Sequence, residues 1–276
     1  MANHVVSLKH PIKLKDIDPA DTDGVKKTPE VEASMDKDLE RLGALQELLY
    51  VAGANAVLVV LQGMDTSGKD GTIRHVFRGV SPLGCSVAAF KAPTAEELAH
   101  DYLWRIHNAC PEKGMLTIFN RSHYESVLVE KVHNIIDKDK LERRYDEINN
   151  FERTLSREGT IIVKFMLHIS KGEQAERLEE RIDTPEKQWK VAAGDWTERE
   201  KWDEYQALYE ELLNRTSTEW APWTVVPADH KWSRNYVVAS RLLDVLGRYE
   251  DEWTQALRAR GDAQMAELRS SGVHRK

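Results

Sequence analysis

The sequence has little cysteine and no long apolar run, and both absences narrow the class of protein. Its two cysteines, Cys85 and Cys110, form no CxxC pair, and no histidine cluster has metal-ligand spacing, which argues against a disulfide framework or a structural zinc site. No apolar run approaches the roughly 18 residues that cross a bilayer, and the first 30 residues lack the apolar centre of a secretory signal. We therefore expect a cytoplasmic protein that does not enter a membrane.

A surplus of basic residues is also missing. The 39 Lys and Arg residues are outnumbered by 46 Asp and Glu residues, giving a formal net charge of -7, which argues against a nucleic-acid-binding protein. The 276 residues, 41% of them hydrophobic, are enough to build an ordinary globular core.

Buried strands alternate with amphipathic helices along most of the chain. Apolar runs predict five strands, at 56–61, 86–90, 115–120, 160–169 and 223–228. Helices are expected from Asp36 to a stop at Gly53, and over 69–78, 94–109, 123–132, 139–155 and 232–249. This order predicts an α/β fold: a three-layer, doubly wound, parallel five-stranded sheet whose strands are each buried on both faces. Residues 1–34 are expected to form an N-terminal arm and 35–276 a single domain ending in a polar tail.

One charged segment, 170–222, interrupts the alternation and contains Trp189, Trp196, Trp202 and Trp220. Two helices joined by a turn with Pro and Gly would form a lid over the carboxyl ends of the strands. The alternative is a solvated helical hairpin whose tryptophans pack on the core.

The stretch VLVVLQGMDTSGKDGT, residues 57–72, places a glycine-rich turn between a buried strand and a helix. Such a turn directs backbone N–H groups and the helix dipole at one point, as phosphate binding requires. Lys69 adds a mobile cation, and the other predicted phosphate-binding residues of the turn are Gly63, Gly68, Gly71 and Thr72. The alternative is a tight turn with an exposed lysine.

The phosphate-loop pattern G-x-x-x-x-G-K-[ST] expects a hydroxyl after the lysine, but this chain has Asp70. We predict that Asp65, inside the loop, holds Mg²⁺ (or Mn²⁺) and helps to activate the attacking oxygen, because magnesium usually takes one or two carboxylates together with phosphate oxygens and water. Asp70 is interpreted as a surface acid that compensates the helix dipole.

The third predicted strand ends in FNRSHYESVLVEKVH, where Arg121 and Glu125 should face the phosphate loop. Arg121 is predicted to neutralise the transferring group, and Glu125 to bind a second metal or to position the acceptor. Alternatively, Glu125 is an ordinary acid at a helix start. Further cations follow other strands or lie in the charged segment, and as a set they predict a focused positive field: Lys91, Arg181, Lys187, Lys190, Lys231 and Arg234.

Five motifs, in this order and at this spacing, resemble the polyphosphate kinase 2 family: GMDTSGKDGT, FKAPTAEELAHDYLWRIH, FNRSHYESVLVEKV, RIDTPEKQWK and APWTVVPADHKWSRN. The resemblance covers residues 36 to 250. It implies a P-loop, nucleoside-monophosphate-kinase-like core with a helical lid, magnesium, and reversible transfer of the terminal phosphoryl of inorganic polyphosphate to AMP or ADP, forming ADP or ATP. It implies that Asp65 and Lys69 serve the metal and phosphates, that Arg121 and Arg181 contact the transferring region, and that the protein is a homodimer or homotetramer.

The chain departs from the family pattern at Asn120, where many members have Asp, so no metal-ligand role is carried to it. Glu125, where other subclasses carry Asn, resembles the subclass that accepts both AMP and ADP. Two rival hypotheses share the fold: a small-molecule or nucleotide kinase that uses ATP as donor, and a nucleotide-binding regulatory module without transfer activity.

Overall fold

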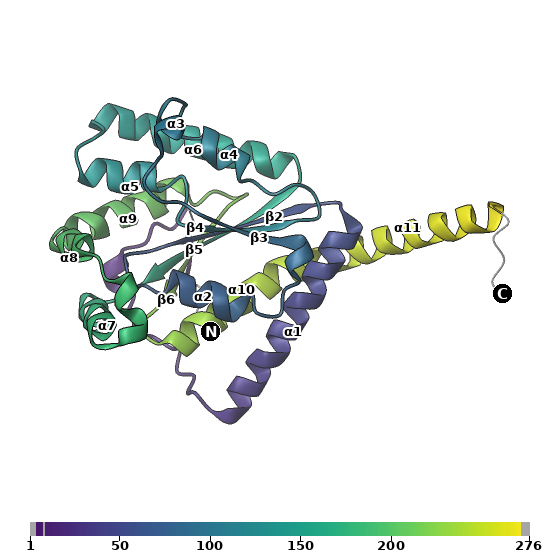
Figure 1. Ribbon diagram of the computed structural model, residues 1–276, viewed down its shortest axis with the longest axis horizontal. Helices are drawn as coiled ribbons and strands as arrows, with labels where there is room; N and C mark the ends of the chain where they lie inside the picture. Colours follow the sequence, from purple (N-terminus) through teal and green to yellow (C-terminus); the bar gives the residue numbers. More distant parts are fainter. Residues whose placement is uncertain (1–3, 8, 272–276) are drawn as a thin grey trace.

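A computed structural model of the chain describes residues 4–7 and 9–271 and contains one six-stranded sheet (Figure 1). The strand order is β1-β6-β5-β2-β4-β3. Strands β2 to β6 run parallel, and β1 pairs antiparallel with β6. Their bounds are β1 (His4–Val5), β2 (Ala56–Gln62), β3 (Cys85–Ala89), β4 (Leu116–Asn120), β5 (Thr160–His168) and β6 (Trp223–Pro227).

The prediction of five parallel strands is confirmed, but the sheet has a sixth strand that was not predicted. The sixth strand, β1, comes from the predicted arm, and the neighbouring Val6 is buried and donates its N–H to the Trp223 carbonyl at 2.8 Å. A strand of two residues is too short to show a periodic sequence pattern, so β1 could not be predicted from the sequence. Residues 1–3 and 8 of the predicted arm lie outside the described residues.

The expectation that every strand is buried on both faces is wrong for β3. The side chains of β2 and β5 are all buried, as their largely apolar sequences predict. In β3, which is an edge strand, Ser86, Val87 and Ala89 are exposed.

Helices cover both faces of the sheet, which confirms the three-layer architecture (Figure 1). On one face lie α1 (Pro29–Ala52), α2 (Lys69–Val76) and α10 (Lys231–Leu246). On the other lie α3 (Ala95–Leu98), α4 (Trp104–Asn108), α5 (Glu125–Val132), α6 (Lys138–Arg157) and α9 (Trp202–Thr216). Helix α1 begins at Pro29, after the N-cap Thr28, and so starts seven residues before the predicted Asp36. The predicted helix 94–109 is divided into α3 and α4.

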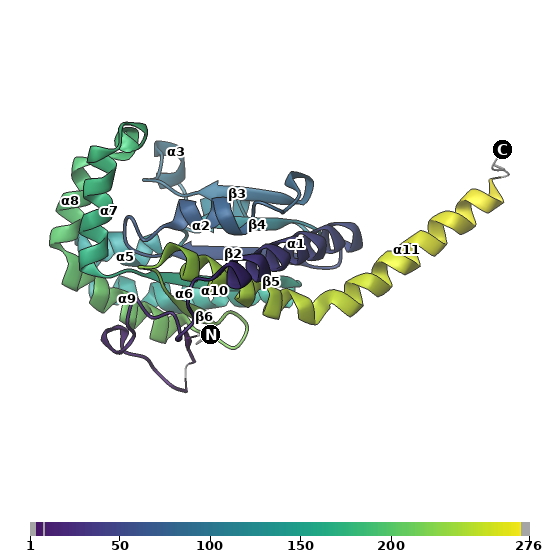
Figure 2. The same cartoon turned by 90° about the horizontal axis from the view of Figure 1, so that it is seen from below.

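The charged segment forms three α-helices rather than the predicted two. Helix α7 (Lys171–Asp183), a 3₁₀ helix (Pro185–Lys190) and α8 (Ala193–Glu200) stand at the carboxyl ends of the strands, and α9 returns along the sheet (Figure 2). Trp189 and Trp196 are exposed, whereas Trp202 is buried. Helices α7 and α8 thus project from the sheet while α9 packs on the core, and the role of α7 and α8 as a lid stays a prediction.

The C-terminal region is a long helix, α11 (Glu250–Ser270), that projects from the body of the molecule where a polar tail was expected (Figures 1 and 2). It is anchored by Trp253, which is buried and donates its indole N–H to Asn55 Oδ1 at 2.8 Å. Residues 272–276 of the predicted tail lie outside the described residues. Within the described part of the chain, no helix has the length and apolarity needed to span a membrane.

Candidate active site

The glycine-rich loop joins β2 to α2 and needs glycine at two points. Gly63 has φ +146°, and a Cβ there would lie 2.6 Å from the Leu167 carbonyl oxygen. Gly68 has φ +102°, and a Cβ there would lie 1.8 Å from an Arg234 guanidinium nitrogen. Left-handed backbone and close neighbours both exclude a larger side chain, so these glycines fix the course of the loop.

Three side chains from other elements fasten the loop through its carbonyl groups. Gln174 Nε2 donates to the Asp65 carbonyl at 3.2 Å, and Arg177 Nη1 donates to the Thr66 carbonyl at 2.9 Å. Arg234 Nη1 donates to the Ser67 carbonyl at 3.3 Å. With these carbonyls engaged, the first N–H groups of α2 remain the donors that a phosphate can use.

Arg234 is buried beneath the loop, 3% exposed, and its guanidinium donates to the Ser67 carbonyl and to Asn235 Oδ1. Burial and the nearby Arg177 charge lower the pKa of Arg234 to about 10. These contacts assign Arg234 to support of the loop, and its direct contact with phosphate stays a prediction.

Lys69 is buried and turned back onto its own loop. Its Nζ donates to the Gly63 carbonyl at 2.7 Å and to the Met64 carbonyl at 3.2 Å. Burial, followed by the Arg121 charge, lowers the pKa of Lys69. The hydroxyls of Thr66, Ser67 and Thr72 are also buried here, with no hydrogen-bond partner among the described residues. The loop therefore holds polar atoms available to a ligand.

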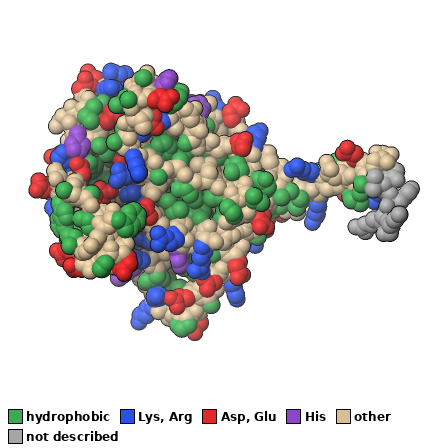
Figure 3. Space-filling model, in the orientation of Figure 1, with side chains coloured by type: hydrophobic (Ala, Val, Ile, Leu, Met, Phe, Trp, Pro, Cys, Tyr) green, Lys and Arg blue, Asp and Glu red, His purple; other side chains and the backbone are tan. Residues whose placement is uncertain are grey.

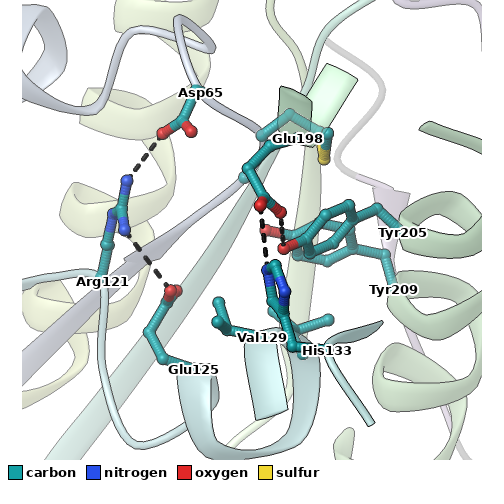
Figure 4. Close-up of a pocket in the computed structure, with 11 residues that line it drawn as sticks. Asp65, Arg121, Glu125, Val129, His133, Glu198, Tyr205 and Tyr209 are labelled. Atoms are coloured by element: carbon teal, nitrogen blue, oxygen red, sulfur yellow. Dashed lines mark hydrogen bonds and ion pairs between the residues drawn. The ribbon is translucent and has the colours of Figure 1, made fainter. Parts of the chain in front are cut away.

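Asp65, Arg121 and Glu125 form one charged group beside the loop (Figure 4). Arg121 Nη2 donates to Asp65 Oδ1 at 2.7 Å, and Arg121 Nη1 lies 3.6 Å from Glu125 Oε2. Burial opposes the charge of Arg121, but Glu125 and Asp65 outweigh it and raise the pKa of Arg121. Burial raises the pKa of Glu125 despite the charges of Arg121 and Lys69. The structure thus brings together the four residues predicted to carry chemistry.

A cavity of about 240 Å³ opens beside this group. Asp65, Arg121 and Glu125 line it together with residues that the sequence reasoning missed, His133, Glu198, Tyr205 and Tyr209. His133 Nε2 lies 2.9 Å from Glu198 Oε1, and the Tyr205 hydroxyl donates to Glu198 Oε2 at 2.5 Å (Figure 4). His133 directly follows α5, and the other three residues come from α8 and α9. They become neighbours only when the segment 170–222 folds, so no local motif joins them.

Two predicted lid cations reach toward the loop region. Lys190 Nζ lies 3.2 Å from Asp70 Oδ2, and Asn120 Nδ2 donates to Asp70 Oδ1 at 2.8 Å, so Asp70 links the lid and β4 to α2. Arg181 Nη1 donates to Asp195 Oδ2 at 2.9 Å. Burial and the nearby Asp65 charge raise the pKa of Asp195, which places this pair within the field of the loop.

The remaining predicted cations are less well placed to contact a phosphate bound at the loop. Lys187 and Lys231 both pair with Glu180, at 2.5 and 3.5 Å; Lys187 is half-buried and Lys231 is exposed. Lys91 is exposed, and its carbonyl accepts from Arg105 Nη1 at 2.9 Å. Figure 3 shows basic side chains beside the hollow on the α5–α8 side of the molecule. A phosphate role for these three lysines stays a prediction.

A fully buried ion pair lies behind the turn that carries Arg121 and Glu125. Lys164 Nζ lies 2.6 Å from Glu152 Oε2 and also donates to the Tyr124 hydroxyl at 2.8 Å. The Tyr124 hydroxyl donates to Glu152 Oε1 at 2.8 Å, and His123 Nε2 lies 3.2 Å from the same oxygen. His123 and Tyr124 immediately precede Glu125, so the network fixes this turn from behind.

The acidic residues fit a magnesium ion that is shared with a substrate. Among residues 4–7 and 9–271 no group of three or more His, Cys, Asp or Glu side chains has metal-binding geometry. Asp65 and Glu125 nevertheless line the same cavity and contact the same arginine. Magnesium commonly takes one or two carboxylates and fills its remaining positions with water and phosphate oxygens.

Comparison with known proteins agrees with this geometry. A family model described as Polyphosphate kinase 2 matches residues 25–253. The chain is 52% identical to an AMP/ADP-polyphosphate phosphotransferase of Meiothermus ruber, over 85% of this chain and 88% of that protein. It is 44% identical to an ADP-polyphosphate phosphotransferase of Rhodopseudomonas palustris, over 80% of this chain and 81% of that protein.

The fold matches as well as the sequence does. The crystal structure of Polyphosphate Kinase 2 from Arthrobacter aurescens superposes with a TM-score of 0.85 at 44% identity, covering 88% of this chain and 87% of that one. The loop, the strand order and these similarities lead to one conclusion: the chain belongs to the polyphosphate kinase 2 family.

Proposed function

We propose that the protein transfers the terminal phosphoryl of inorganic polyphosphate to AMP and ADP, reversibly, forming ADP and ATP. One observation carries the proposal: Asp65, Arg121 and Glu125 are joined by ion pairs, beside a lysine-containing phosphate loop, along one cavity. Supporting it, the relative from Meiothermus ruber, which aligns over most of both chains, is an AMP/ADP-polyphosphate phosphotransferase.

In the proposed reaction, a terminal phosphate oxygen of the nucleotide attacks the last phosphorus of polyphosphate. A new P–O bond forms, the bridging P–O bond breaks, and the shortened polyphosphate leaves with the bonding electrons. Catalysis of this kind depends mostly on positioning and on neutralising charge. The charged group beside the loop can supply both.

Each residue then has a role at a stated atom. Lys69 exchanges the Gly63 and Met64 carbonyls for phosphate oxygens, and Arg121 neutralises the phosphoryl in transfer. Asp65 and Glu125 would hold Mg²⁺ (or Mn²⁺), which when bound offsets negative charge on phosphate oxygens. Lys190 and Arg181 would bring the lid over the reacting groups.

The test is product analysis with purified variants. With magnesium, each of AMP, ADP, GMP and GDP is supplied with either polyphosphate or ATP as the only donor, and nucleotides are separated by chromatography. We expect ADP and ATP from AMP and ADP with polyphosphate. Asp65→Asn and Lys69→Ala should each lower turnover about 10²-fold or more, because transition-state charge loses its stabilisation.

The matched control is Lys113→Ala, which removes an exposed lysine outside the site and should keep normal turnover. Unchanged product formation from polyphosphate in Asp65→Asn or Lys69→Ala would refute the residue assignment. Transfer from ATP alone would favour the ATP-dependent kinase, and nucleotide binding without any product would favour the regulatory module.

We also propose that the protein is a homo-oligomer, a dimer or tetramer, with β3 at the contact between copies. The open edge of β3 carries unpaired backbone groups, which readily pair with another strand. Leu83, just before this strand, is 75% exposed, and Val87, within it, is 52% exposed. A second copy presenting the same edge would bury both the apolar side chains and the unpaired backbone groups.

A further inference from the structure

A second cavity, of about 230 Å³, lies at the end of the sheet opposite the candidate active site. Strand β5 begins at Thr160, but its pairing with β6 begins only at Lys164. Residues 160–163 therefore pair with β2 on one side, and on the other side they have no partner strand within the described part of the chain. The cavity occupies this gap and is closed by Trp220 and by the last turns of α10.

Two arginines that line this cavity, Arg241 and Arg248, have side chains without an acceptor in residues 4–7 and 9–271. Arg241 and Arg248 lie seven residues apart, at the end of α10 and in the turn after it, and neither has a hydrogen bond or an ion pair among the described residues. Arg241 Nε is buried without a partner, and so is the indole Nε1 of Trp220. Buried donors without acceptors cost free energy, so both N–H groups are available to a ligand in the cavity.

The other buried or half-buried arginines of the described chain differ from Arg241 in this respect. Arg144, Arg177 and Arg181, for example, each donate to a carboxylate or a carbonyl. Among the described buried and half-buried arginines, the unpaired state is therefore particular to Arg241, whereas Arg248 is exposed and unpaired, as several exposed arginines of the chain are.

The charges around the cavity favour an anion. Burial and the Arg248 charge both lower the pKa of Arg241, with Asp244 opposing them. Arg153 lies 5.5 Å from the centre of the Trp220 ring and adds a third positive charge nearby. Glu219 is the acidic residue among the described lining residues, so the lining keeps a net positive charge.

We propose that this cavity binds a phosphate group, held by the guanidinium groups of Arg241 and Arg248 and by the indole N–H of Trp220. Arginine suits this role because its planar fork of donors matches phosphate oxygens. The shared chemistry allows three sources: free orthophosphate, the end of a polyphosphate chain, or the phosphate of a nucleotide. The site is separate from the transfer site, which lies at the other end of the strands.

Calorimetric titration tests the site in a background where the active site is weakened, the full-length chain carrying Lys69→Ala and Arg121→Ala. The probes are orthophosphate, tripolyphosphate and AMP, at fixed salt. We expect at least one probe to bind, and Arg241→Gln with Arg248→Gln to weaken that binding about tenfold or more, since charged hydrogen bonds are lost. The matched control, Arg258→Gln with Arg269→Gln, removes two exposed charges from α11 and should leave binding unchanged.

A second measurement needs no substitution. Phenylglyoxal modifies accessible arginines, and peptide mapping by mass spectrometry reports each position. The probe that binds should protect Arg241 and Arg248 in the wild-type protein while Arg258 is modified at an unchanged rate.

The probe that binds identifies the source. Orthophosphate binding indicates free phosphate, binding of tripolyphosphate alone indicates a chain end, and binding of AMP alone indicates a nucleotide. Binding that is equal in the glutamine variant and its background, or modification of Arg241 and Arg248 that no probe slows, would overturn the proposal.

Discussion

Two residues of the candidate site hold a backbone conformation that L-residues with side chains seldom adopt. Arg121 and Thr66 both have φ +63°, one just after β4 and the other within the phosphate loop. Such a conformation costs of order 1–3 kcal/mol and persists only where the surroundings enforce it. Here Arg121 N–H donates to the Leu61 carbonyl at 3.0 Å, and Arg177 holds the Thr66 carbonyl. In this backbone conformation the Arg121 side chain reaches Asp65.

Gly68→Ala tests how strictly the loop backbone must be kept. The new Cβ would overlap the Arg234 guanidinium, and the left-handed backbone would be strained as well. We expect turnover with polyphosphate to fall about tenfold or more, because even small displacements of positioning groups are costly. The control is Gly261→Ala, in the open part of α11, where a Cβ meets nothing within 4 Å. Equal turnover in the two variants would show that the loop tolerates displacement.

The location of a site residue was predictable where one short segment contains the whole sequence pattern. Gly63, Asp65, Gly68 and Lys69 lie within seven residues of a buried strand end, so their shared location follows from the sequence. The pairing of His133 with Glu198 was not predictable, because 65 residues separate them and no local pattern links the two.

At the level of elements, the buried Lys164–Glu152 pair connects β5 to α6 and reaches two further segments. Lys164 Nζ also donates to the Thr216 carbonyl at the end of α9, at 2.8 Å. Tyr124 brings in the turn between β4 and α5. Both charged side chains are 0% exposed. The pair therefore fixes the Arg121–Glu125 turn relative to the segment that closes the cavity.

Removal of one partner should be far more harmful than removal of both. Lys164→Met leaves a buried, unpaired carboxylate and should lower the free energy of unfolding by about 3–5 kcal/mol, whereas Lys164→Met combined with Glu152→Gln should cost much less. Urea denaturation at pH 7 measures both. A single variant as stable as the double variant would contradict an ionised pair.

The same pair makes a prediction about pH. Burial raises the pKa of Glu152, but the Lys164 charge and the His123 hydrogen bond outweigh it, and the net shift is downward. The resulting stability is complete above the unfolded pKa of about 4.3 and is lost as pH falls toward the folded pKa. Between pH 5 and the acid transition, wild type should lose stability more steeply than the double variant. If urea denaturation shows that the free energy of unfolding falls equally with pH in the two proteins, the lowered pKa of Glu152 is ruled out.

Long periodic segments predicted their elements well, and short or exposed ones did not. The expected strand 160–169 is β5 (Thr160–His168), because so long a mostly apolar stretch favours burial within the sheet. The helix expected over 94–109 failed because the capping box of Thr94 starts a helix of only four residues, which α4 does not continue. Helix α11 was missed because, apart from Trp253, its side chains pack on little and no core periodicity is required of it.

At the scale of the whole molecule, two surfaces expose several large apolar side chains. One is the β3 edge with Leu83 and Val87, and the other is α11, where Leu257, Met265 and Leu268 are 38 to 46% exposed. The remaining strand edge is occupied, because the N-terminal β1 covers β6. Contiguous apolar surface at an open sheet edge is typical of a contact between chains.

Val87→Glu places a carboxylate at the centre of the proposed contact between two β3 edges. A buried and unpaired charge is strongly unfavourable, so we expect the oligomer to dissociate at concentrations about tenfold higher than for wild type. Sedimentation velocity over a dilution series measures this. Val191→Glu is the control, because Val191 is 43% exposed but lies in the lid, away from β3. If Val87→Glu sediments as wild type does while Val191→Glu dissociates, the contact lies near Val191 and not at the β3 edge.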